Sequence, residues 1–193
     1  LANLGINAVG VPGTIDLDIA CTEYTIGFDT AVNTGMDALN KLRDTSNSHE
    51  RCSVVEVMGR DAGWLTGASA LSKGDDCEGP AMVLLPEVDF DYEYVKNRVA
   101  ELMETKKSLV ITVSEGVRTK EGKYVCELGS EKGTDAFGHT MLTGTAQTIA
   151  TMLKNDLGIK TRAVELSTLQ RCASHIASLT DITESFAVGE AAV

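Results

Sequence analysis

Three features that identify particular classes of protein are missing from this sequence. No apolar run approaches the roughly 20 residues that a membrane-spanning helix needs, so we expect no membrane partner. Basic residues are scarce, at 17 against 28 acidic ones, and the net charge of −11 argues against nucleic acid as a partner. A pocket for a small phosphate ester stays compatible with this charge, because it needs only a few arginines.

Cysteine pairs are the third missing feature. No CxxC occurs, which argues against a disulfide framework or a zinc site and favours a cytoplasmic, reducing location. The scattered cysteines are Cys21, Cys52, Cys77, Cys126 and Cys172. The histidines at 49, 139 and 175 also lack metal-ligand spacing, and we expect structural roles for them.

What is present is typical of a globular protein. The sequence is 43% hydrophobic and 23% charged, and its 193 residues suffice for one domain, or for one domain with pieces of a second. It starts without methionine and stops at "GEAAV" within an apparent helix, so we expect an internal fragment.

Short apolar runs predict the strands. We expect strands in "SVVEVM" (53–58), "AMVLLPEV" (81–88), "SLVITVSEG" (108–116) and "TRAVEL" (161–166), and a further one in "INAVGVPGTI" (6–15). The first four are near-continuously apolar, which indicates strands covered on both faces.

Helical spacing fills the segments between these runs. Residues 24–44, 89–107 and 135–158 repeat apolar positions three and four apart or place acids first and lysines or glycine last. Strands that alternate with helices predict an α/β fold with a doubly wound, mainly parallel sheet. Ligands of such sheets bind beyond the carboxyl ends of the strands, so we expect functional residues there.

An acidic pair follows the first of these runs. Asp16 and Asp18 would share one side of an extended segment, which suits a Mg²⁺–phosphate site where one carboxylate orients the metal and the other accepts a proton. The alternative is a turn in which Asp18 caps a helix that begins near Ala20.

Charged residues also follow later strands. Arg60 could stabilise a transferring phosphoryl group, or pair with Asp61 on the surface. Glu115 could accept hydrogen bonds from sugar hydroxyls, or lie in a helix N-cap region. Three further arginines could hold a phosphate, or form ordinary ion pairs: Arg51, Arg162 and Arg171.

Taken together, these segments resemble the phosphofructokinase family. The matching stretches are "PGTIDLDI", "TIGFDTA", "LRDTSNSHERCSVVEVMGRDAG", "LLPEV", "SEG" and "TRAVELSTLQR", in the family's order over most of the chain. The resemblance implies a glycolytic phosphotransferase with an alcohol group as acceptor, which transfers a phosphoryl group from ATP to the 1-hydroxyl of fructose 6-phosphate.

The resemblance also implies catalytic roles. Asp16 would take the proton from the sugar 1-hydroxyl, Asp18 would help to position Mg²⁺, Thr14 would contact the transferring group and Arg60 would stabilise the transition state. Gly13 would lie at the nucleotide.

Other matched positions would bind the sugar phosphate. Arg51 and Arg162 would reach the substrate of a neighbouring subunit, so a homo-oligomer with shared sites is expected. The substrate-binding set is Thr14, Ile15, Asp16, Arg51, Met58, Gly59, Arg60, Glu115, Arg162, Thr168 and Arg171.

Several positions depart from the family pattern. Thr168 stands where a histidine is usual, Leu17 replaces asparagine, and Cys172 and Ala173 replace two glycines. Arg43 matches an effector-site arginine and so an allosteric enzyme is expected, although residues 79–81 lack the acid that a nucleoside diphosphate's Mg²⁺ would need.

The glycine-rich nucleotide motifs of the family are not in the sequence. We therefore interpret residues 1–28 and 172–193 as edges of a nucleotide domain and residues 29–171 as the sugar-phosphate domain, and expect the fragment alone to be inactive. In pyrophosphate-dependent relatives a lysine usually replaces Gly13, so its glycine favours ATP. The alternatives are a pyrophosphate-dependent phosphotransferase and a non-catalytic sugar-phosphate-binding homologue.

Overall fold

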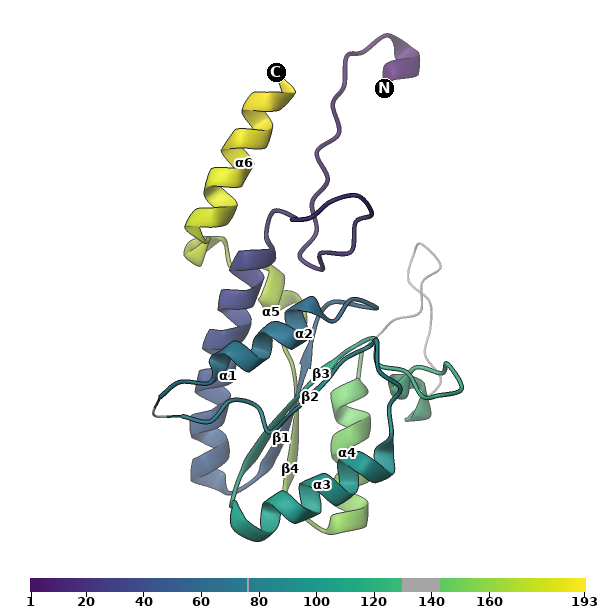
Figure 1. The fold of residues 1–193 in the computed structure, drawn as a ribbon, viewed down its shortest axis with the longest axis vertical. Helices are drawn as coiled ribbons and strands as arrows, with labels where there is room; N and C mark the ends of the chain where they lie inside the picture. The colour runs from purple at the N-terminus through teal and green to yellow at the C-terminus, as the bar shows by residue number, and fades with distance from the viewer. Residues whose placement is uncertain (76, 130–142) are drawn as a thin grey trace.

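The computed structural model describes residues 1–75, 77–129 and 143–193, in which helices and strands alternate (Figure 1). The α/β prediction is therefore confirmed. The elements are α1 (Phe28–His49), β1 (Cys52–Val57), α2 (Trp64–Ala68), β2 (Met82–Leu84), α3 (Tyr92–Thr105), β3 (Leu109–Ser114), α4 (Thr145–Leu157), β4 (Thr161–Glu165), α5 (Ser167–Arg171) and α6 (Leu179–Ala192). Short 3₁₀ helices cover Ala2–Leu4, Ser69–Ser72, Val125–Leu128 and Ser174–Ile176.

The four strands form a parallel sheet in the order β2-β3-β1-β4. The central strands β1 and β3 are buried almost throughout, as their apolar sequences predict. The edge strands β2 and β4 are only partly buried, so the expectation that all four are covered on both faces is wrong for these two. Strand β2 also stops at Leu84, because Pro86 cannot donate a ladder hydrogen bond and the chain turns at 85–88.

The expected strand over residues 6–15 does not form. No described strand pairs with this segment, and Ile6, Val9 and Val11 are 49%, 68% and 48% exposed. An extended segment becomes a strand only when its backbone groups pair with a neighbour, and here the ladder of β1 is completed by β3 and β4.

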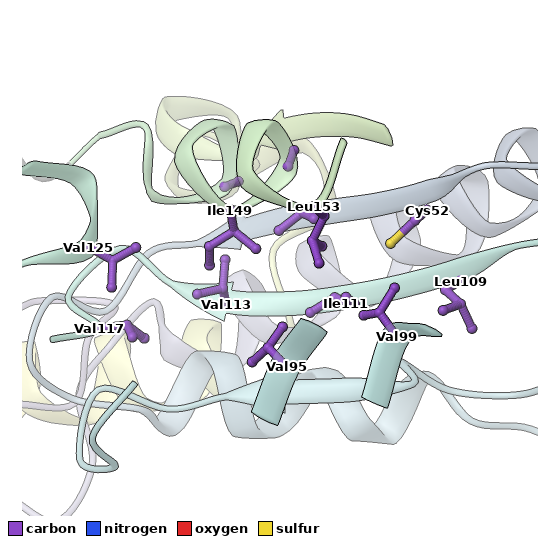
Figure 2. Close-up of a cluster of buried hydrophobic side chains, with 13 residues drawn as sticks. Cys52, Val95, Val99, Leu109, Ile111, Val113, Val117, Val125, Ile149 and Leu153 are labelled. Carbon is purple, nitrogen blue, oxygen red and sulfur yellow. The ribbon is translucent and has the colours of Figure 1, made fainter. Parts of the chain in front are cut away.

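Helices cover both faces of the sheet. Strand side chains alternate in direction, so Val54 joins a core with α3 and α4 while Val55 joins a second core with α1 and α2. Figure 2 shows the first core, where Val95 and Val99 of α3 and Ile149 and Leu153 of α4 surround β3. The two cores hold the central strands in place from both sides.

The helix boundaries differ in part from those expected. Helix α1 begins at Phe28, later than residue 24, and α3 begins after Asp91, whose carboxylate accepts a hydrogen bond from Tyr94 N at 3.0 Å. Helix α4 ends at Gly158 with φ 66°, as predicted; the expected helical residues 135–142, and His139 among them, lie outside the described residues. Within the described part of the chain, no helix is both long and apolar enough to cross a bilayer.

A buried carboxyl joins the end of β1 to the start of α4. Glu56 is 4% exposed, and its Oε2 accepts a hydrogen bond from Ala146 N at 2.9 Å. Burial raises the pKa of Glu56 to about 7; the N–H groups of Ala146 and Gly144 lower it, and the carboxylates of Glu165 and Glu115 raise it. Because Gly144 has no side chain with which to cap α4, Glu56 takes that role from the sheet.

Replacing Glu56 by glutamine should remove a pH dependence of stability. The ordinary pKa of 4.5 is raised in the folded protein, so the wild type loses stability as the pH rises from about 4.5 to about 7. Glutamine keeps an acceptor and carries no charge. The variant should therefore be about 3 kcal/mol more stable than the wild type at pH 8, with little difference at pH 4.5. Urea unfolding at both pH values measures this, with Glu104→Gln on the exposed side of α3 as the control; a difference that does not change with pH would contradict the assignment.

Candidate active site

The carboxyl ends of β1 and β3 bring two of the expected functional residues together. Val57 and Ser114, the last residues of these strands, are paired in register. Arg60 follows β1 and Glu115 follows β3, and Arg60 N donates a hydrogen bond to Glu115 Oε1 at 3.2 Å. Because β1 and β3 are parallel neighbours, the turn that carries Arg60 lies against the Glu115 carboxylate at the carboxyl ends of the strands.

The backbone of this turn packs closely against the end of β3. Gly59 has φ 141° and Arg60 has φ 48°, a left-handed conformation that is unusual for arginine. Ser114 Oγ donates a hydrogen bond to Arg60 O at 3.1 Å. A Cβ at Gly116 would lie 1.7 Å from that same oxygen, so only glycine allows the close approach.

Asp61 belongs to a second contact of the turn. Its Oδ1 pairs with the Arg118 guanidinium at 2.7 Å, and that guanidinium lies over the Tyr124 ring at 4.2 Å from the ring centroid. These contacts hold the outer side of the turn.

The acidic pair lies in a non-helical segment. Because α1 begins only at Phe28, the alternative in which Asp18 caps a helix near Ala20 is wrong. Asp16 N donates a hydrogen bond to Thr14 Oγ1 at 3.2 Å. Asp16 Oδ1 is buried and has no hydrogen-bond partner in the described part of the protein, an unusual state for a buried carboxylate oxygen.

Electrostatic coupling places Asp16 in the same neighbourhood as Glu115. Burial raises the pKa of Asp16 and Asp18 raises it further, whereas Arg60 and Arg171 lower it. Burial also raises the pKa of Glu115, as does Asp16, while the N–H of Arg60 lowers it. Residues from four separate segments therefore share one electrostatic environment.

Gln170 is a supporting residue whose role the sequence pattern does not predict. It is 2% exposed, and its Oε1 accepts a hydrogen bond from Met58 N at 3.0 Å. It thereby ties α5, with the exposed Thr168 and Arg171, to the end of β1. A glutamine next to an arginine gives no sequence signal of such burial.

Two of the expected arginines lie elsewhere. Arg51 precedes β1, and Arg162 is paired in register with Ser53, so both are near the amino ends of the strands. The idea that three arginines hold one phosphate is therefore wrong within a single chain. Arg43 also lies away from Arg60, in a separate pocket of about 510 Å³ with Lys106 and Lys107.

Metal ligands are few. The described residues contain no group of three or more His, Cys, Asp or Glu side chains that could hold a metal ion. The described residues therefore do not form an all-protein metal cage, and a divalent ion held here would take only one or two carboxylates from them.

Known proteins are similar to this chain in both sequence and fold. The phosphofructokinase family model matches residues 1–193. Pyrophosphate–fructose 6-phosphate 1-phosphotransferase of Dictyoglomus thermophilum is 43% identical over 90% of this chain and 48% of its own length. ATP-dependent 6-phosphofructokinase of Clostridium acetobutylicum is 42% identical over 86% of this chain and 51% of its own. The crystal structure of pyrophosphate-dependent phosphofructokinase from Marinobacter aquaeolei superposes with a TM-score of 0.77 at 30% identity, over 100% of this chain and 45% of that one.

The parallel four-stranded sheet carries charged residues beyond the carboxyl ends of β1 and β3. The chain belongs to the phosphofructokinase family. It spans about half the length of the curated relatives it matches. The relatives include both ATP-dependent and pyrophosphate-dependent enzymes, and family members typically need a divalent metal ion.

Leu17, between the two aspartates, should carry backbone strain. Its φ of 60° is left-handed, a conformation that costs most residues about 1 kcal/mol and asparagine less. Leu17→Asn and Leu17→Ala both remove the apolar side chain, but only asparagine adopts this backbone readily. The asparagine variant should therefore be about 1 kcal/mol more stable than the alanine variant in urea unfolding. Equal stabilities would show that the backbone at this position is unstrained.

Proposed function

We propose that this chain is part of a 6-phosphofructokinase that transfers the terminal phosphoryl group of ATP to the 1-hydroxyl of fructose 6-phosphate. The observation that carries the proposal is the shared electrostatic environment of Asp16, Arg60 and Glu115 at the ends of the strands. A non-catalytic homologue has no physical need for a half-buried carboxylate with an unpartnered oxygen at this place.

The sugar phosphate would bind across the ends of β1, β3 and β4. Glu115 would accept hydrogen bonds from sugar hydroxyls, and the backbone of Met58 and Gly59 would line the sugar. Arg171, on α5 after β4, would hold its phosphate. Arg51 and Arg162 would contact the sugar phosphate of a neighbouring subunit. Their position near the amino ends of the strands, away from Arg60 and Glu115, supports this role.

Asp16 would accept the proton of the 1-hydroxyl as the hydroxyl oxygen attacks the terminal phosphorus. The bond from that phosphorus to the leaving ADP oxygen breaks as the new bond forms. Arg60 would stabilise the negative charge on the transferring group, and Thr14 would contact it.

Asp18 would be the protein's ligand for Mg²⁺, directly or through water, together with donor phosphate oxygens. When bound, Mg²⁺ neutralises charge on the donor phosphates. We further propose that residues 29–171 form the sugar-phosphate domain, that residues 1–28 and 172–193 belong to a nucleotide domain, and that the enzyme works in the cytoplasm, where its free cysteines stay reduced.

We propose ATP as the donor because the space beside Gly13 is open. A Cβ at Gly13 would meet no atom within 4 Å, and glycine itself brings no side chain that would compete with a donor phosphate bound beside it. The second candidate is a pyrophosphate-dependent enzyme, which the name of the Dictyoglomus thermophilum relative favours.

Replacing Asp16 by serine in the complete enzyme should strongly reduce turnover with little effect on sugar binding. Without its proton acceptor, kcat should fall by on the order of 10²–10⁴-fold, while the KM for fructose 6-phosphate changes little. Steady-state assays with ATP and, separately, with pyrophosphate measure both quantities. Asp37→Ser, on the exposed side of α1, is the matched control and should leave both unchanged.

Three results would contradict parts of this proposal. Near-normal turnover by the Asp16 variant would make Asp16 structural. Turnover of the wild type with pyrophosphate alone would overturn the choice of ATP. Binding of fructose 6-phosphate without turnover by either donor would leave only the non-catalytic homologue.

A further inference from the structure

Asp181, in the first turn of α6, caps the start of α1. Its side chain is 6% exposed and accepts hydrogen bonds from Gly27 N at 2.8 Å, Thr30 N at 2.8 Å, Thr30 Oγ1 at 2.5 Å and Tyr24 Oη at 3.1 Å. The N-cap of α1 is Gly27, which has no side chain to offer. Two N–H groups at the start of α1, those of Gly27 and Thr30, are therefore satisfied by a residue about 150 positions later in the chain.

The capping is reciprocal. Thr30 Oγ1 accepts a hydrogen bond from Ser178 N at 3.0 Å, and Ser178 Oγ accepts one from Asp181 N at 3.1 Å. Thr30, Ser178 and Asp181 thus form a two-helix cap that ties the first turns of α1 and α6 together. Burial alone would raise the pKa of Asp181, but hydrogen bonds from Thr30 and Gly27 outweigh it and hold that pKa below its ordinary value. Asp181 is accordingly a carboxylate acceptor for all four donors.

This cap supports the segment that carries Asp16. Gly27 has φ 103°, and a Cβ placed on it would lie 3.4 Å from Ile15 Cγ2, so Ile15 packs directly on the backbone that Asp181 holds. Ile15 is next to Asp16 in the chain, and Ile15, Gly27 and Asp181 line one pocket of about 280 Å³. No described strand pairs with the Asp16 segment, so it is held by this contact with Gly27 and by the packing of Ile15 against the second core.

The sugar-binding side of the site has a different support. Arg171 also lines this pocket, but its helix α5 is tied to β1 through the hydrogen bond from Met58 N to Gln170. Losing the two-helix cap would therefore loosen Asp16 more than Arg171.

We propose that Asp181 is a positioning residue for phosphoryl transfer, acting through Gly27 and Ile15 on the placement of Asp16. The inference rests on the function proposed above. Asp181 itself does not contact the substrate; it fixes the place from which Asp16 takes the proton.

Variants on both sides of the cap test this in the complete enzyme. Asp181→Asn keeps the shape of the side chain but loses an acceptor, and Thr30→Val removes the hydroxyl from α1. Each should lower kcat about tenfold or more, because small displacements of a reacting group are costly, while the KM for fructose 6-phosphate stays within about threefold. The double variant should lose little more than either single one, because both break the same contact.

Two further variants serve as comparisons. Glu184→Gln changes an exposed acid on α6 and should leave kcat and KM unchanged. Gln170→Ala should give the opposite pattern, with a raised KM, because it loosens Met58 and Arg171.

The possible outcomes separate this inference from the function it rests on. A wild-type enzyme without phosphotransfer would overturn both. An active wild type whose folded Asp181→Asn and Thr30→Val variants keep kcat within twofold, or lose it only through KM, would overturn the positioning role alone. If one variant unfolds at the assay temperature, as a thermal melt would show, the other decides.

Discussion

The approach of the Arg60 backbone to the end of β3 is the contact on which the rest of the site depends. One carbonyl oxygen, that of Arg60, accepts a hydrogen bond from Ser114 and lies where a side chain at 116 would be. The N–H of the same residue binds Glu115. The ends of the parallel strands β1 and β3 are therefore joined in one corner, formed by Arg60 after β1 and by Ser114, Glu115 and Gly116 at the end of β3. The corner carries one cationic side chain and one carboxylate.

The other parts of the site are held by hydrogen bonds between residues that are far apart in the sequence. Gln170 reaches from α5 to the end of β1, and Asp181 reaches from α6 to the start of α1. Figure 1 shows residues 1–27 and α6 projecting beyond the same end of the sheet. The Arg60–Glu115 contact thus rests directly on the sheet, while the Asp16 segment rests on the capped start of α1 and on the packing of Ile15 against the second core.

Much of the fold follows from local sequence pattern, and the departures have local physical causes. The apolar sequences of β1 and β3 predict central strands, and the alternation with helices predicts a parallel sheet. Residues 6–15 also contain regularly placed apolar residues but pair with no described strand, and β2 is cut short by Pro86. Apolar pattern alone shows that a segment prefers burial; it does not show which partner will pair with it.

The site residues likewise fall into those that the sequence pattern predicts and those that it does not. Strand-end position predicts that Arg60 and Glu115 meet, because parallel strands share an edge. It does not predict the roles of Gln170, Glu56 or Asp181, which depend on burial and on partners far away in the chain. Arg51 and Arg162 show that residue type alone does not place a side chain in the site, since both lie near the amino ends of the strands, opposite Arg60 and Glu115.

Fructose 6-phosphate binding by a Gly116→Ala variant, measured by calorimetry on the complete enzyme, tests the central claim most directly. The added methyl group must push the Arg60 turn away from β3, so we expect at least a tenfold loss of affinity, whereas Gly189→Ala, whose Cβ meets no atom within 4 Å, should bind like the wild type. A folded Gly116→Ala protein with unchanged affinity would show that the corner between β1 and β3 does not build the sugar-phosphate site.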